Sequence, residues 1–174
     1  KGYIDAAHTN LSEIGFVGVT GYNPEIDRLF RIVASAWEEF CGLPLRVKMQ
    51  YHFPATGGQV GYTPNGIEQS GGRDFVERRE HFMIDMPLPE RHPLREMYGS
   101  MFYLKNPPVK EVPELVPAGE QLLLCLEDLS LLHFEAMAEA NGLPRGWWSS
   151  RIAYGISKLR IHNYPKLPEG TTFI

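Results

Sequence analysis

The chain has 174 residues, 43% of them hydrophobic and 22% charged, with a formal net charge of −4 at pH 7. These values are typical of one globular domain with a sizeable core, and the acidic balance argues against a nucleic-acid-binding surface. No apolar run approaches the length of a membrane span, and two cysteines are too few for a disulfide framework. We therefore expect a cytoplasmic protein with neither a membrane nor a nucleic-acid partner.

The first half of the chain is predicted to contain a strand, a helix and a long loop. Residues 14–20 form a short apolar run bounded by glycine, which is typical of a buried strand. Asn23 and Pro24 then predict a helix start, because proline at the first helical position loses no hydrogen bond. An apolar stripe follows at three- and four-residue steps, and Gly42 ends it. Residues 50–72 are rich in glycine, proline and polar residues, which predicts a long ordered loop.

The second half is predicted to alternate between strands and helices. Residues 75–85 favour a strand or a strand preceded by a helical turn, because hydrophobic and other side chains alternate near the end of the segment. Residues 94–104 and 118–141 have helical periodicity, and the second of these predicted helices is the longest in the chain. The segment 151–154 is predicted to begin another strand, and 158–164 to form the last one.

The last predicted strand is the most informative segment. Side chains two residues apart share a face of a strand, so its residues divide into two sets. The sets are Lys158, Arg160, His162 and Tyr164 on one face and Leu159, Ile161 and Asn163 on the other. A face made only of polar and aromatic side chains lines either solvent or a wet cavity.

Local motifs identify no active site. His133 and Glu135 are the only His-x-acid pair, but residues two apart on a helix point in nearly opposite directions and cannot chelate one ion. Glu77 and His81 are four apart and would share a helical face. An ion pair or surface contact is expected there, because no third ligand has a fixed relation to them. Nucleophile elbows and phosphate-binding glycine loops are absent from the sequence.

Six segments nonetheless form an ordered set that covers nearly the whole chain. They are the Gly-Phe strand at 15–20, the helix closed by Leu43-Pro44-Leu45, the Gly-Tyr loop at 61–66, Arg79-Glu80 with its strand, the helix end at Gly142-Leu143-Pro144, and the strand at 159–165. In this order they resemble the amino-terminal half of the isopenicillin N synthase-like family of iron(II)/2-oxoglutarate oxygenases.

The resemblance implies an α+β fold in two parts. Residues 1–150 would form a helical and mixed amino-terminal region, and residues 151–174 would begin a jelly-roll (double-stranded β-helix) barrel that is incomplete in this chain. Members of the family hold Fe(II) with two histidines and a carboxylate and use 2-oxoglutarate and O2 to oxidise a small molecule. The metal ligands are expected beyond Ile174, so none is assigned here, and the complete enzyme is expected to be a monomer.

The resemblance also implies roles for particular residues. Tyr164 matches a tyrosine whose hydroxyl contacts the oxoacid, and His162 stands where many plant members have an asparagine near the same oxoacid. The polar face of this strand, with Tyr164, is then expected to line a concave cavity. Arg160 would point into the barrel or form an outer salt bridge. Substrate-side residues are then Gln59, Tyr62, Thr63 and Arg160, with an ordered surface loop as the alternative interpretation of the first three.

Three functional hypotheses follow. The first is an iron(II)/2-oxoglutarate-dependent oxygenase that hydroxylates, desaturates or cyclises a small molecule, although some relatives do not use 2-oxoglutarate. The second is a truncated or non-catalytic module that needs a partner to complete its barrel, because an opening barrel strand alone leaves backbone groups unpaired. The third is an unrelated α+β enzyme.

Overall fold

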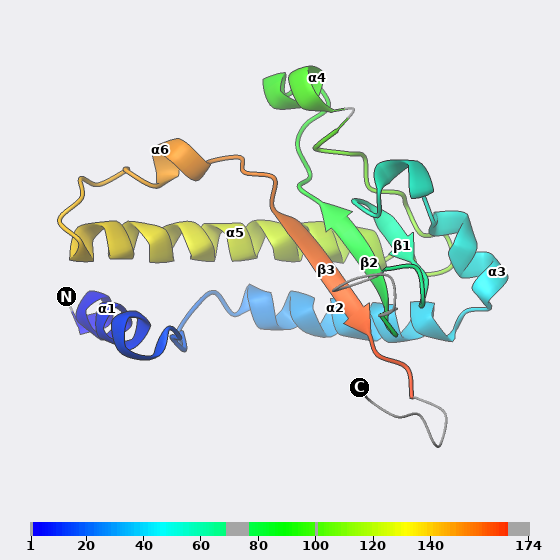
Figure 1. Ribbon diagram of the computed structural model, residues 1–174, viewed down its shortest axis with the longest axis horizontal. Coiled ribbons are helices and arrows are strands. Elements are labelled where there is room, and N and C mark those ends of the chain that lie inside the picture. Colours follow the sequence, from blue (N-terminus) through cyan, green and yellow to red (C-terminus); the bar gives the residue numbers. More distant parts are fainter. Residues whose placement is uncertain (1, 69–76, 100, 167–174) are drawn as a thin grey trace.

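The computed structural model describes residues 2–68, 77–99 and 101–166 of the chain. Two long helices, α2 and α5, lie side by side and antiparallel, and a small sheet crosses them (Figure 1). The elements are α1 (Gly2–Ile14), α2 (Glu25–Gly42), α3 (Leu45–Lys48), the 3-10 turns η1 (Met49–Tyr51) and η2 (Pro54–Thr56), β1 (Gly61–Thr63), β2 (Glu80–Asp85), α4 (Pro93–Tyr98), α5 (Leu115–Ala140), α6 (Ser149–Ile152) and β3 (Lys158–Asn163). The described residues thus mix helices with a sheet, as an α+β fold requires.

α2 forms where the sequence predicts a helix. The side chain of Asn23 accepts a hydrogen bond from the backbone amide of Glu25 at 3.0 Å, which satisfies one of the amides that every helix start leaves free. At the other end, the amide of Leu43 bonds to the carbonyl of Phe40. The buried face consists of Ile26, Leu29, Val33, Ala36, Trp37 and Phe40. This predicted helix is confirmed.

α5 is also confirmed, with a start three residues earlier than predicted. Its end has the glycine stop that the sequence indicates. Gly142 has a φ of +70°, and the amide of Leu143 bonds to the carbonyl of Ala138 at 2.9 Å. This pattern closes the last helical turn, because a glycine tolerates the left-handed conformation that other residues avoid.

The three strands are antiparallel in the order β1-β2-β3 within the described residues. One cross-strand row, Tyr62–Phe82–Ile161, faces the helices. β2 lies in the middle, and all six of its residues are buried. The prediction of a strand within 75–85 is confirmed from Glu80 onward, while residues 75 and 76 lie outside the described part.

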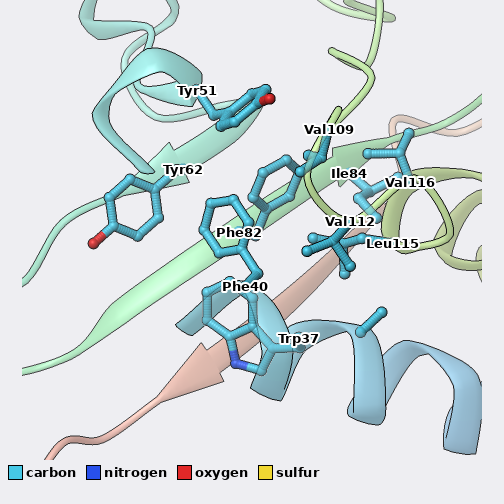
Figure 2. Close-up of a cluster of buried hydrophobic side chains, with 11 residues drawn as sticks. Trp37, Phe40, Tyr51, Tyr62, Phe82, Ile84, Val109, Val112, Leu115 and Val116 are labelled. Atoms are coloured by element: carbon cyan, nitrogen blue, oxygen red, sulfur yellow. The ribbon is translucent and has the colours of Figure 1, made fainter. Parts of the chain in front are cut away.

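An aromatic cluster joins α2 to the sheet (Figure 2). The ring of Phe40 lies 5.5 Å from the ring centroids of Trp37, Tyr62 and Phe82, and 5.9 Å from that of Tyr51. Three of these contacts are edge-to-face, an arrangement that adds to the gain from burial alone. α5 closes the cluster with Leu115 and Val116.

We expect Gly61→Ala to destabilise the fold by about 2–3 kcal/mol. Gly61 begins β1 with a φ of +80°, and an added Cβ would lie 2.5 Å from the carbonyl oxygen of Tyr51 and 2.8 Å from the ring of Phe53. Gly57→Ala is the matched control, because Gly57 has a φ of +61° but no neighbour within 4 Å of an added Cβ. Urea denaturation would measure both changes, and equal losses would contradict the role assigned to the close backbone contact.

The strand predicted at residues 14–20 is wrong. Residues 16–20 have no regular structure and connect α1 to α2, and Phe16 is 71% exposed. A strand needs a neighbour to satisfy its backbone groups, and no described strand pairs with this segment. α1, which precedes it, was not predicted, because Ala7 is its single buried residue and the helical periodicity is therefore weak.

Two other segments differ from the predictions. The predicted loop at 50–72 contains η1, η2 and β1 up to residue 68, and residues 69–72 lie outside the described part. β1 is only three residues long, too short for alternation to reveal it. The segment 151–154 starts no strand, because Arg151 and Ile152 belong to α6 and their amides bond back to the carbonyl of Trp148.

The predicted helix at 94–104 is shorter than expected, since α4 ends at Tyr98. Among the described helices, none has the length and apolar character that crossing a bilayer demands.

Candidate functional site

The polar face of the final strand lies on the side of the sheet that faces away from the helices. Leu159 and Ile161 pack against the core formed with α2 and α5. Because side chains alternate along a strand, Lys158, Arg160 and His162 lie on the opposite face. The two faces predicted for β3 are confirmed for the strand residues.

One cross-strand row on this outer face contains three polar side chains, one from each strand. Thr63 of β1 lies opposite His81 of β2, and His81 lies opposite His162 of β3. The centroids of the two imidazole rings are 5.7 Å apart. We call Thr63, His81 and His162 the polar row.

Several hydrogen-bonding groups of the polar row are buried without partners. His81 is 0% exposed, and neither of its ring nitrogens has a hydrogen-bond partner among the described residues. The same is true of Nδ1 of His162 and of the hydroxyl of Thr63. Because buried polar groups nearly always have partners, water or groups outside the described residues would satisfy these atoms.

Burial favours the neutral form of both imidazoles. It lowers the pKa of His81 to about 4, against the opposing effect of Glu68 and with the help of Arg160. For His162, burial and then Arg79 and Arg160 lower the pKa. A neutral imidazole has one donor and one acceptor nitrogen, so at neutral pH both rings can bond to uncharged polar groups.

The charged groups beside the polar row are largely paired with one another. Arg79 donates to Glu68 at 2.8 Å and also pairs with Glu77. Glu68 in turn lies 3.8 Å from Nε2 of His81. The ion pair expected between Glu77 and His81 is therefore replaced by the Glu77–Arg79 pair, because His81 belongs to β2 rather than to a helix.

The residues predicted for the oxoacid lie at the end of β3. The ring of Tyr164 stacks on that of His162, with centroids 5.9 Å apart and planes inclined by 29°. Tyr164 is 68% exposed, so the expectation that it lines a cavity is not met within the described residues. Arg160 lies on the same face, opposite Met83, with its side chain exposed.

The residues predicted for the substrate are divided between the two faces. Thr63 joins His162 in the polar row, and the carbonyl of Gln59 accepts a hydrogen bond from Lys158 at 3.3 Å, which brings the preceding loop to β3. Tyr62 instead lies in the aromatic cluster on the opposite face, with its hydroxyl pointing away from the rings (Figure 2). His81 was not predicted as a site residue. Alternation from 80 to 85 puts it on the face opposite Phe82, but its place beside His162 depends on the pairing of β2 with β3.

A second polar group is buried on the core face of the sheet. The carboxylate of Glu80 accepts hydrogen bonds from Lys48 at 2.8 Å, from the hydroxyl of Tyr62 at 2.5 Å and from the amide of Asn163 at 2.8 Å. Lys48 also donates to the carbonyl of Cys41 at 3.2 Å. We call Glu80, Lys48, Tyr62 and Asn163 the carboxylate hub, which connects α3 to all three strands.

The described residues do not provide an iron site. Across residues 2–68, 77–99 and 101–166, no three side chains of the types His, Cys, Asp and Glu are arranged to hold a metal ion. His133 and Glu135 have different partners, as expected for residues two apart on a helix: Nδ1 of His133 lies 2.7 Å from the hydroxyl of Tyr3, whereas Glu135 accepts bonds from the amides of Gly146 and Ser149.

No protein-family profile matches the sequence, and no curated protein matches it. Solved structures do match. One is a Caulobacter crescentus protein provisionally assigned to the 2OG-Fe(II) oxygenase family, with a TM-score of 0.68 and 26% identity over 87% of this chain. Like the six-segment resemblance, this alignment spans most of the chain, and it supports the broader 2OG-Fe(II) oxygenase similarity.

The chain shares its fold with 2OG-Fe(II) oxygenases. A full-length Neurospora crassa protein in complex with alpha-KG aligns with a TM-score of 0.64 and 18% identity over 94% of this chain. JOX2 in complex with 2OG, Fe and JA aligns with a TM-score of 0.56 and 21% identity over 86%. The chain spans about half the length of these structures or less, covering 46%, 49% and 40% of them.

Proposed function

We propose that the chain is the amino-terminal portion of an oxygenase that depends on non-haem iron(II) and 2-oxoglutarate and oxidises a small molecule. The observation that carries this proposal is the match to the Caulobacter crescentus 2OG-Fe(II) oxygenase family protein over 87% of the chain at 26% identity. The order of the six sequence segments supports the finer assignment to the isopenicillin N synthase-like family.

In this proposal the described residues supply the scaffold and one wall of the site, and iron ligands come from elsewhere in the complete enzyme. Iron with 2-oxoglutarate would supply the oxidising chemistry. The helices α2 and α5 hold the core face of β3, which leaves His162 on the outer face to meet polar groups of the oxoacid or substrate. The imidazole of His162 and the hydroxyl of the exposed Tyr164, with Arg79 beside it, are the polar groups at this end of the strand that suit the role.

The test is 2-oxoglutarate consumption by the natural protein that carries this sequence, with its intact mass measured first. We expect succinate formation that needs added Fe(II) and stops when a chelator removes the metal. The 174-residue chain alone should form none, because its described residues hold no metal cluster. Absence of iron-dependent succinate from the natural protein would refute the proposal, and succinate from the 174-residue chain would refute the location of the iron ligands.

Tyr164→Phe in the natural protein tests the predicted oxoacid contact within the same assay. Loss of one hydrogen bond to a charged group should raise the KM for 2-oxoglutarate about 10-fold. Iron affinity should stay unchanged, because no metal ligand is altered. An unchanged KM would remove Tyr164 from the site.

A second candidate function is a binding module completed by a partner. It is favoured by β3, which pairs on one side only among the described residues, so its other edge offers backbone groups for strand addition. Gel filtration of the 174-residue chain distinguishes the two functions. A partner-completed module should elute as a stable complex with a second protein. That complex should not consume 2-oxoglutarate.

A further inference from the structure

The carboxylate hub is a densely hydrogen-bonded polar group buried between the sheet and the helices. Glu80 and Lys48 are each 7% exposed, so both charges are removed from most of the solvent. Oε2 of Glu80 accepts from Lys48 and Tyr62, and Oε1 accepts from Asn163. With three donors the carboxylate is well satisfied, which a buried charge requires.

The position of the hub along the strands gives it a role beyond a simple ion pair. Glu80 is the first residue of β2, and in the antiparallel register it lies opposite Asn163, the last residue of β3. Asn163 directly precedes Tyr164. The amide of Asn163 is therefore the link through which α3 and β1, by way of Glu80, hold the end of β3.

Apart from the bond of Asn163, the end of β3 is restrained in the described part of the chain by the stacking of Tyr164 on His162 and by the interaction of Tyr164 with Arg79. β3 has β2 as its one neighbour, and the side chain of Tyr164 is 68% exposed even though its ring stacks on His162. The hydrogen bonds of an edge strand, which is paired on one side, open more easily at the end of the strand than in its middle. A side-chain bond to a buried charged group at that end opposes the opening.

We infer that Glu80 is a positioning residue that, through Asn163, fixes the end of β3 and the direction in which Tyr164 leaves the strand. The inference rests on the proposed function, since it makes the hub a support for the oxoacid-binding end of the strand. It also assigns Tyr62 to this support, because its hydroxyl is bound to Glu80 in the core.

The first test measures the strand itself and needs no activity. Asn163→Ala cuts the link between Glu80 and β3 but keeps the Lys48–Glu80 pair. Tyr51→Phe is the matched control, because it removes a hydroxyl–carboxylate bond of 2.5 Å, to Glu111, away from the hub. By hydrogen–deuterium exchange we expect the amides of residues 158–164 to exchange about 10-fold faster in Asn163→Ala than in Tyr51→Phe. Equal exchange in the two variants would overturn the inference.

The second test separates positioning from general stability in the natural protein. Asn163→Ala should raise the KM for 2-oxoglutarate about 10-fold with little change in kcat, while Tyr51→Phe should leave both unchanged. Faster exchange with an unchanged KM would overturn positioning of the site and leave the hub a purely structural contact. If the wild-type natural protein forms no succinate, the proposed function is refuted. The anchoring of β3 by Asn163 is then tested by the exchange result alone.

Discussion

Glu80→Leu is expected to destabilise the fold by about 3–5 kcal/mol, because it leaves the ammonium of Lys48 buried without its partner. The double variant Lys48→Met with Glu80→Leu should recover most of this loss, since it removes both charges and fills similar volumes. Urea denaturation of the wild type, both single variants and the double variant completes the cycle. A double variant as unstable as the worse single variant would contradict a buried pair whose main penalty is an uncompensated charge.

The same group determines part of the acid sensitivity of the fold. Burial opposes ionisation of Glu80, but the hydrogen bonds from Lys48, Tyr62 and Asn163 outweigh it and lower the pKa. A carboxyl with a lowered pKa in the folded state stabilises the fold above its unfolded pKa, about 4.3, and loses that contribution as the pH falls through the folded value. Wild type should therefore lose more stability below about pH 4 than the double variant, which has no carboxylate hub.

Phe40→Ala should destabilise the fold by about 3–5 kcal/mol, because it opens a cavity at the centre of the aromatic cluster. Phe40 is fully buried and touches four other aromatic rings. Phe30→Ala on the same helix is the control, since Phe30 is 62% exposed and should change stability by less than about 0.5 kcal/mol. Chemical denaturation would compare the free energies of unfolding of the two variants. Similar losses of stability would mean that the cluster does not centre on Phe40.

The Phe30 comparison also shows a limit of periodicity. Phe30 falls on the apolar stripe by spacing, as Leu29 does, yet the structure exposes Phe30 and buries Leu29. A stripe predicts which side of a helix is buried, but its edge depends on which neighbours cover it. In α2 those neighbours are α5 and the sheet, which lie far away in sequence.

The local patterns that did predict structure share one property. The cap at Asn23, the glycine stop at Gly142 and the alternation in β3 each depend on residues close in sequence, so neighbouring side chains alone determine them. The predicted strand at 14–20 failed for the opposite reason. Its apolar residues satisfy a local pattern, but a strand also needs a distant partner, and no described strand is placed there.

The family resemblance, rather than any single motif, predicted the function. Similarity of fold to 2OG-Fe(II) oxygenases agrees with it, whereas no local sequence motif indicated an oxidation. The roles of His162, Tyr164 and Arg160 at an oxoacid or substrate stay predictions, and the assay of Tyr164→Phe tests the oxoacid contact directly.

The amino-acid sequence by itself determined the two long helices and the faces of β3, because these follow from the spacing of side chains along a continuous segment. Only the tertiary structure placed Thr63, His81 and His162 in one row, and Asn163 on Glu80 from a position 83 residues away. Strand register decides these contacts, and a shift of one residue would turn His81 into the core and Phe82 out of it. Packing of α2 and α5 against one face of the sheet excludes that shift, because Phe82 and Ile84 are buried there.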